Sequence, residues 1–191
     1  MRALLLDFNG TISDDEHVLC RIFTELFAEE KPLSEDEYYE RLAGLADREI
    51  VQRWLGRDDP MLVERKIERY GELADGSTVT PEARDAVEYA AGRVPVAVVS
   101  GSARAEIEPV LAKAGLLESV TAIVASDDIG RSKPDPEGYL IALQMLGVEA
   151  AQAAAVEDSE AGIKAAKAAG LYCAAVATTL PAERLSAATS R

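Results

Sequence analysis

Acidic, hydroxyl and basic side chains follow four short apolar runs of this sequence. In chain order they are Asp7, Asn9, Gly10 and Thr11, then Ser100, Gly101 and Ser102, then Lys133, and finally Glu157 and Asp158. If the runs are parallel strands, their carboxyl ends form one ligand-binding edge, where we expect these residues to meet. Carboxylates gathered at one place favour a cation between them. Hard oxygen ligands suit Mg²⁺, which pairs with phosphate, so the pattern predicts a Mg²⁺ and phosphate site.

Each group also has a purely structural interpretation. Asp7 alone is compatible with a turn cap, and Lys133 alone with a solvated surface charge. The serines of segment 100–102 are good helix N-caps, and the acids at 157–158 suit a helix start. Because all four groups occur together, at the ends of successive apolar runs, the joint pattern favours a functional site.

The spacing of apolar residues predicts the elements that position these side chains. Helical spacing over 14–71 predicts about four helices, one of which starts with the capping box Ser34 and Glu37. Strands are expected at 4–6, 94–99, 120–125, 153–156 and 172–176, and helices from 81 onward and at 103–114, 136–146, 161–169 and 181–188. This alternation predicts an α/β fold with a doubly wound parallel sheet. The expected units are a core of 1–13 and 77–191 and an all-helical insert of 14–76.

Composition limits the classes of partner and compartment. The chain has 191 residues, a net charge of −14 and 48% hydrophobic residues, as expected for one folded domain with an inserted module. The negative charge argues against binding to nucleic acid, and no apolar window approaches the roughly 20 residues that span a bilayer. Cys20 and Cys173 are far apart and are expected to be reduced. We therefore expect a cytoplasmic protein, a monomer or weak homodimer, that does not bind membranes.

Four strings of the sequence carry a family resemblance. They are Asp7-Phe8-Asn9-Gly10-Thr11, Val98-Val99-Ser100-Gly101, Lys133-Pro134-Asp135-Pro136, and the long string from Val156 to Ala166 that begins Val156-Glu157-Asp158-Ser159. They resemble the four motifs of the haloacid dehalogenase-like (HAD) superfamily, and the last is most similar to its β-phosphoglucomutase-like branch of phosphatases and mutases. The resemblance covers the whole chain, including a helical cap after the first motif. It implies a Rossmann-like core with this cap.

The resemblance also implies roles for individual residues. Asp7 would be the nucleophile that forms an aspartyl phosphate, and Lys133 would offset charge between it and the phosphate. Mg²⁺ would be held by Asp7, the backbone carbonyl of Asn9 and Asp158, with Glu157 acting through water. The remaining residues expected to hold the phosphorylated substrate are Gly10, Thr11, Ser100, Gly101 and Ser102.

Asn9 departs from the family pattern, which usually has Asp two residues after the nucleophile. That Asp protonates the leaving oxygen and then activates water, and an amide cannot do either at neutral pH. Losing a general acid/base typically costs about 10²–10⁴-fold in rate. Three explanations stay open: a natural variant with its acid/base elsewhere, a slow or non-catalytic phosphate-binding relative, or an engineered Asp-to-Asn change.

The start of the cap also departs from the family pattern. Mutases of this branch commonly have Glu-Pro-x-His, whereas here Glu16 is followed by His17, and Leu19 occupies the place of the histidine. His17 is expected near the mouth of the site, either as a solvent-facing residue or as a substitute acid/base. Arg48 is a candidate contact to the distal group of the substrate, with a surface ion pair as its alternative.

The expected function is Mg²⁺-dependent hydrolysis of a small phosphorylated metabolite through phospho-Asp7. One alternative is a phosphomutase of the β-phosphoglucomutase type, against which Asn9 and Leu19 argue. A second alternative is a non-catalytic sensor of phosphometabolites. Metal-independent dehalogenation is disfavoured by the acids at 157–158, and phosphonate hydrolysis would need one of the cap lysines, Lys31 or Lys66. The sequence does not identify the metabolite.

Overall fold

A five-stranded parallel sheet forms the centre of the computed structural model, which describes residues 1–189, with side chains to 186. The strands are β1 (Ala3–Leu6), β2 (Val96–Val99), β3 (Ala122–Val124), β4 (Ala153–Glu157) and β5 (Tyr172–Ala175), in the spatial order β3-β2-β1-β4-β5. β1 lies between β2 and β4, with Leu5 beside Ala97 on one side and beside Ala155 on the other. The predicted parallel α/β fold is confirmed.

The helices occupy the positions that the apolar spacing predicts, with ends that differ by a few residues. They are α1 (Glu16–Phe27), α2 (Glu35–Arg41), α3 (Asp47–Leu55), α4 (Pro60–Leu73), α5 (Pro81–Ala91), α6 (Arg104–Lys113), α7 (Glu137–Leu146), α8 (Glu160–Ala168) and α9 (Ala182–Thr189), with 3-10 turns at Leu117–Ser119, Ser126–Asp128 and Ala150–Gln152. The capping box of Ser34 and Glu37 is present, and Thr80 caps α5. None of the helices in the described part of the chain has the length and apolar character that crossing a bilayer requires.

Alternating side chains of the strands divide the core into two layers. Leu6, Val96 and Val98 belong to a cluster with α5, α6 and the inserted helices. Leu5 and Ala97 face the other way, into a cluster with α7 and α8. Since strand side chains alternate with a period of two, short apolar runs that are buried on both faces need helices on both sides, which is the doubly wound arrangement.

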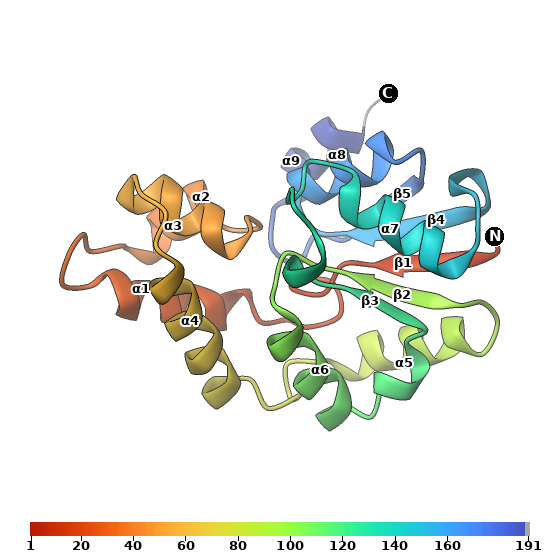
Figure 1. Cartoon of the computed structure of the whole chain (residues 1–191), viewed down its shortest axis with the longest axis horizontal. Coiled ribbons are helices and arrows are strands. Elements are labelled where there is room, and N and C mark those ends of the chain that lie inside the picture. The colour runs from red at the N-terminus through yellow and green to blue at the C-terminus, as the bar shows by residue number, and fades with distance from the viewer. Residues whose placement is uncertain (190–191) are drawn as a thin grey trace.

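Helices α1 to α4 form a separate lobe beside the carboxyl ends of the strands (Figure 1). Its interior includes Phe23, Tyr38 and Trp54, which are almost completely buried. Trp54 is therefore a core residue of this lobe, and its indole N–H donates to the backbone carbonyl of Lys31 at 2.8 Å. The lobe faces the edge of the sheet at which the functional residues were expected.

Candidate active site

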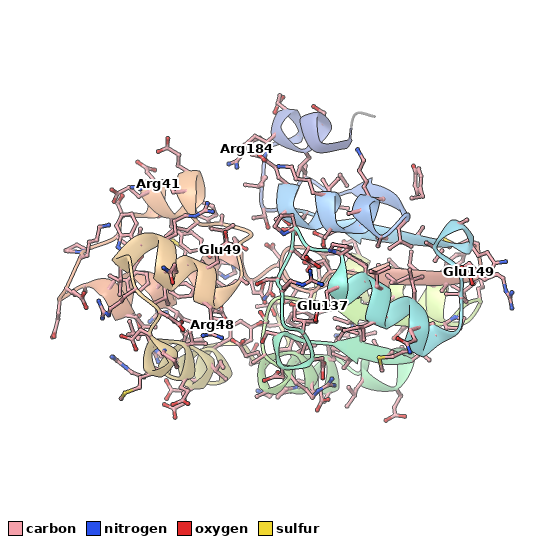
Figure 2. All side chains as sticks on the ribbon, turned by 45° about the horizontal axis from the view of Figure 1, so that its top comes forward. Arg41, Arg48, Glu49, Glu137, Glu149 and Arg184 are labelled. Carbon is pink, nitrogen blue, oxygen red and sulfur yellow. The ribbon has the colours of Figure 1, made fainter. Side chains whose placement is uncertain are left out.

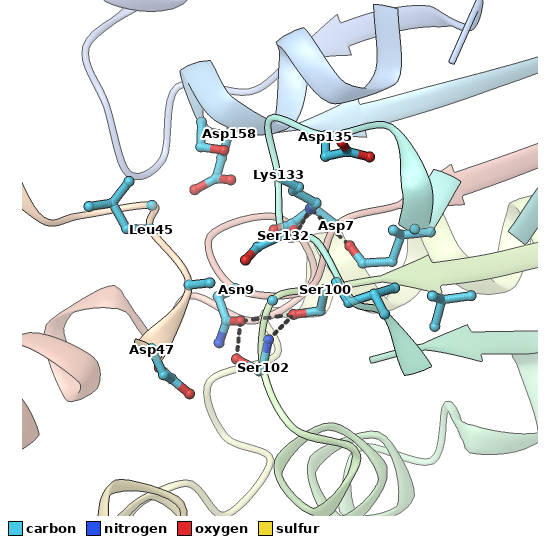
Figure 3. A pocket seen from close by; sticks show the side chains of 18 of the residues that line it. Asp7, Asn9, Leu45, Asp47, Ser100, Ser102, Ser132, Lys133, Asp135 and Asp158 are labelled. Carbon is cyan, nitrogen blue, oxygen red and sulfur yellow. Dashed lines mark hydrogen bonds and ion pairs between the residues drawn. The ribbon is translucent and has the colours of Figure 1, made fainter. Parts of the chain in front are cut away.

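The ends of β1, β2 and β4 bring the expected residues into one cavity. Leu6 pairs with Val98 and with Val156, so the three strands end level with one another. The cavity beyond them is lined from the sheet side by Asp7, Asn9, Ser100, Gly101, Ser102, Lys133 and Asp158 (Figure 3). Glu157 lies behind this lining and is fully buried.

Lys133 joins the first and last motifs. Its Nζ donates to Asp7 Oδ1 at 2.5 Å, to Glu157 Oε1 at 2.6 Å and to the backbone carbonyl of Val99 at 2.9 Å. Burial alone would lower the pKa of Lys133, but the carboxylates of Asp7 and Glu157 outweigh burial and raise it. Lys133 therefore stays charged and holds the Asp7 carboxylate in a fixed orientation.

Three buried carboxylates gather beside Lys133. Asp7, Glu157 and Asp158 each offer an oxygen within 4.8 Å of the others. Burial, followed by the neighbouring acids, raises the pKa of Asp158, and burial is also the largest cause of the raised pKa of Asp7. A divalent cation with a preference for oxygen ligands would relieve this repulsion, so the donor set fits Mg²⁺.

Glu157 is held mainly by protein groups. Besides the ammonium of Lys133, the hydroxyl of Tyr139 donates to its Oε1 at 2.6 Å and that of Ser159 to its Oε2 at 3.2 Å. A Cβ on Gly162 would lie 1.9 Å from the Glu157 carboxyl carbon, so α8 can approach only because that position is glycine. These contacts favour a positioning role for Glu157, consistent with the water-mediated part implied by the family resemblance.

The side chain of Asn9 is engaged at both of its polar ends. Its Oδ1 accepts hydrogen bonds from the hydroxyls of Ser102 at 2.8 Å and Ser100 at 3.3 Å (Figure 3). Its Nδ2 donates to Asp15 Oδ2 at 3.0 Å, and the hydroxyl of Tyr70 donates to the same oxygen. The amide thus ties the end of β1 to the loop after β2 and to the start of the helical lobe.

Gly10 and Thr11 support the site from outside the cavity lining. Gly10 has φ +73°, and a Cβ there would lie 2.0 Å from Asp158 Oδ2. Only glycine fits both this left-handed conformation and the close approach of Asp158. Thr11 is half-buried and its buried Oγ1 has no hydrogen-bond partner among the described residues.

Arg48 and His17 do not reach the cavity. The guanidinium of Arg48 pairs with Asp58, and its side chain is 70% exposed on the helical lobe (Figure 2). His17 is exposed near the start of α1 and is absent from the described residues that line the cavity. The surface ion pair named as the alternative for Arg48 is the arrangement observed.

Glu16 and Asp47, which directly precede His17 and Arg48, line the cavity instead. Glu16 is buried, and its Oε1 accepts a hydrogen bond from the hydroxyl of Tyr38 at 2.6 Å. Burial raises the pKa of Glu16 to about 7. Asp47 begins α3 and lines the same wall. Glu16 stands at the glutamate of the Glu-Pro-x-His pattern, which is a sequence signal for it, whereas Asp47 is signalled only by its place beside Arg48.

Asp47 belongs to a buried ion cluster that joins the helical lobe to the core. Lys66 of α4, which has no exposed surface, donates to Asp47 Oδ2 at 2.9 Å and to Glu106 Oε1 of α6 at 2.7 Å. Glu106 also accepts from the backbone N–H of Ala103 at 3.0 Å, just after the serine loop. Lys66 is therefore a structural residue, whereas the sequence analysis named it as one of two cap lysines that phosphonate hydrolysis would need.

Comparison with known proteins identifies the family. A model of haloacid dehalogenase-like hydrolases matches residues 1–170. The chain is 32% identical to validoxylamine A 7'-phosphate phosphatase of Streptomyces hygroscopicus subsp. limoneus, over 98% of this chain and 91% of the relative. It is 31% identical to fructose-1-phosphate phosphatase YqaB of Escherichia coli, over 88% of this chain and 93% of the relative.

A solved structure agrees with these sequence matches. The crystal structure of CbbY from Rhodobacter sphaeroides in complex with phosphate superposes with a TM-score of 0.82 at 28% identity, covering 92% of this chain and 85% of that one. The fold described above is thus shared with that protein over most of both chains. The chain belongs to the haloacid dehalogenase-like hydrolases, in a group that contains phosphatases and phosphomutases.

Proposed function

We propose that this chain is a Mg²⁺-dependent phosphatase that hydrolyses a small phosphorylated metabolite through a phosphoryl group carried by Asp7. The observation that carries the proposal is the arrangement of Asp7 between Lys133 and the carboxylate of Asp158, in a cavity at the strand ends. A buried carboxylate held by a lysine beside an oxygen-rich cation site has the parts that phosphoryl transfer requires.

Asp7 is the nucleophile in this proposal. Its free carboxylate oxygen attacks phosphorus, the bond from phosphorus to the leaving oxygen breaks, and phospho-Asp7 forms. The leaving oxygen takes a proton from solvent water, because the amide of Asn9 cannot donate one. Water then attacks phosphorus and gives its proton to solvent, the bond from phosphorus to Asp7 breaks, and inorganic phosphate leaves. Lys133, bonded to the other oxygen of Asp7, keeps the carboxylate oriented and offsets negative charge as the phosphate approaches.

The cation site and the serine loop complete the phosphate pocket. Asp7, Asp158 and the backbone carbonyl of Asn9 would hold Mg²⁺, with Glu157 acting through water. When bound, Mg²⁺ neutralises charge on the phosphoryl oxygens. Gly101 lies along the cavity wall, and its backbone N–H would donate to those oxygens. The hydroxyl of Ser100 would join it by turning its proton from Asn9 Oδ1 to the phosphate.

Residues 14–76 form the cap of the site. Leu45 and Ala46 line the cavity opposite the serine loop, and a Cβ on Gly101 would meet the Ala46 Cβ at 3.2 Å. This close approach limits the space above the phosphate pocket. Gly10 shapes the floor through its close approach to Asp158.

Asn9 favours a second candidate function, that of a non-catalytic protein that binds phosphorylated metabolites. Its amide cannot give up and recover a proton at the leaving oxygen, and its side chain is tied to Asp15 and Ser102. The phosphate pocket does not need that proton, so binding persists even where turnover is slow.

Replacement of Asn9 tests the proposal. The parent protein and the Asn9→Asp variant are assayed with Mg²⁺ against a panel of phosphorylated metabolites and nitrophenyl phosphate. The phosphatase proposal expects a gain of about 10²–10⁴-fold in turnover, and Asp7→Asn in the same background abolishes it. If neither protein binds phosphate or turns over any phosphomonoester, the proposal is wrong. If the parent is fast and Asp at position 9 adds nothing, another group supplies the proton.

A further inference from the structure

The wall that the cap contributes to the cavity is acidic and apolar. It consists of Glu16, Leu19, Gly44, Leu45, Ala46 and Asp47. None of these described residues carries a positive charge, and two carry carboxylates. This wall lies across the cavity from the phosphate pocket, so it meets the part of the substrate that is distal to its phosphate.

Both carboxylates are fixed by groups behind them. Tyr38 donates to Glu16 Oε1 at 2.6 Å, and Lys66 lies 2.9 Å from each oxygen of Asp47. A carboxylate oxygen accepts two hydrogen bonds, so each of these bonded oxygens keeps a lone pair for a further donor. The two groups are therefore pre-oriented acceptors whose geometry does not depend on the substrate.

No cation lining the described cavity is free to receive a distal anion. Lys133 is shared between Asp7 and Glu157. Arg131 is 72% exposed and is paired with Asp135 at 3.2 Å and Glu137 at 3.1 Å, the latter labelled on α7 in Figure 2. Arg48, the residue best suited to bind a second phosphate, points to Asp58 on the surface.

We propose that this cavity selects phosphate monoesters whose distal end is a hydrogen-bond donor, a hydroxyl or ammonium group, and rejects those with a second phosphate or a carboxylate. The proposal rests on the phosphatase or phosphate-binding function of the same site. It assigns distal recognition to Asp47 and Glu16 instead of Arg48. It also separates this chain from the CbbY mutant of Rhodobacter sphaeroides, whose crystal structure contains xylulose-(1,5)bisphosphate.

Electrostatics sets the direction of the preference. A second anion would be placed beside Asp47 and Glu16, with no unpaired lining cation in the described cavity to offset it, and bringing like charges together costs affinity. A hydroxyl donates to either carboxylate, and an ammonium group adds attraction. We expect the dissociation constants of the donor-bearing esters to be at least about tenfold lower than those of the doubly anionic esters. A tenfold difference in dissociation constant needs only a modest difference in binding free energy.

Binding of matched ligands tests the proposal without requiring turnover. Calorimetric titrations with excess Mg²⁺ use the full chain and glucose 6-phosphate, glucosamine 6-phosphate, 6-phosphogluconate and fructose 1,6-bisphosphate, with inorganic phosphate as the reference. The first two sugars should bind at least about tenfold more tightly than the last two. The variants Asp47→Asn and Glu16→Gln, which keep shape but remove charge, should each reduce that ratio severalfold. Their affinity for inorganic phosphate should not change.

Two matched controls change the same charges elsewhere on the cap. Asp36→Asn and Glu64→Gln lie at exposed positions outside the cavity lining and should leave the ratio unaltered. Asp47→Asn leaves Lys66 paired one-to-one with Glu106, so folding is retained, and a thermal melt verifies this. Equal or tighter binding of 6-phosphogluconate or the bisphosphate overturns the inference while phosphate binding stands. Failure to bind inorganic phosphate at all would instead remove the proposed function.

Discussion

Replacement of Lys66 by methionine should strongly destabilise the protein. The ammonium group has no exposed surface and lies within 2.9 Å of two carboxylates, Asp47 in the cap and Glu106 in the core. Methionine fills the same volume without a charge, so packing is largely retained and two buried acids lose their counterion. Removing one partner from a buried ion cluster typically costs about 3–5 kcal/mol.

The pH dependence of the unfolding free energy supplies an independent test of this destabilisation. In the native protein burial already raises the pKa of Glu106 to about 7 although Lys66 is present. In Lys66→Met the pKa rises further, so folded Glu106 retains a proton that the unfolded chain releases. An acid with a raised folded pKa loses stability as pH rises from its unfolded value to its folded value. Over three pH units, from 5 to 8, one such proton corresponds to about 4 kcal/mol in the variant. The native protein, with Glu106 titrating at a pKa of about 7, already loses about 2.7 kcal/mol between pH 5 and 7, so the difference between the two proteins grows by about 1.4 kcal/mol.

Urea unfolding followed by circular dichroism at pH 5 and pH 8 measures both effects. Relative to the native protein, Lys66→Met should lose about 3–5 kcal/mol at pH 8 and about 1–2 kcal/mol less than that at pH 5. The double variant Lys66→Met with Glu106→Gln should recover part of the loss, because one of the uncompensated acids is gone. The exposed neighbour Arg65→Met is the control. A loss below about 1 kcal/mol at pH 8, or an equal loss at both pH values, would refute the reasoning.

Two further predictions concern the metal and His17. Mg²⁺ at about 100 times its dissociation constant should stabilise the protein by about 2.7 kcal/mol in urea unfolding, and Asp158→Asn should remove this gain. If Mg²⁺ leaves the unfolding midpoint unchanged, there is no cation site at Asp7 and Asp158. His17→Ala should leave phosphate binding and any turnover within about twofold, since His17 is exposed outside the described cavity lining. A large loss of turnover in a steady-state assay would show that His17 acts in the site.

The sheet edge could be predicted from the sequence because its signals are local. Asp7, Ser100 and Asp158 each closely follow an apolar run, and parallel strands carry such residues to a common edge. Lys133 follows its strand only after a longer loop, so its exact place depends on that loop. Helix starts at Ser34 and Thr80 were equally local, since a cap needs only the next three residues.

The cap wall could not be predicted in the same way. Consecutive helix residues are separated by about 100°, so neighbours point in different directions. Asp47 rather than Arg48 faces inward because it pairs with Lys66, a residue distant in sequence. Lys66 is in turn held by Glu106, which it meets only when α4 and α6 pack together. Likewise Glu16, and not His17, accepts a hydrogen bond from the hydroxyl of Tyr38, which lies on α2. Pairings of this kind are absent from any local pattern.

The central place of β1 in the sheet sets an order of events during synthesis. Leu5 pairs with Ala97 and Ala155, so the nearer of its neighbouring strands is made about 90 residues later. At about 5–20 residues per second, β1 emerges and waits roughly 5–20 s with both edges unpaired. The helices of the insert need only nearby residues and can form meanwhile. During that time an apolar strand is exposed. A chaperone would therefore have most to protect in this early interval of translation.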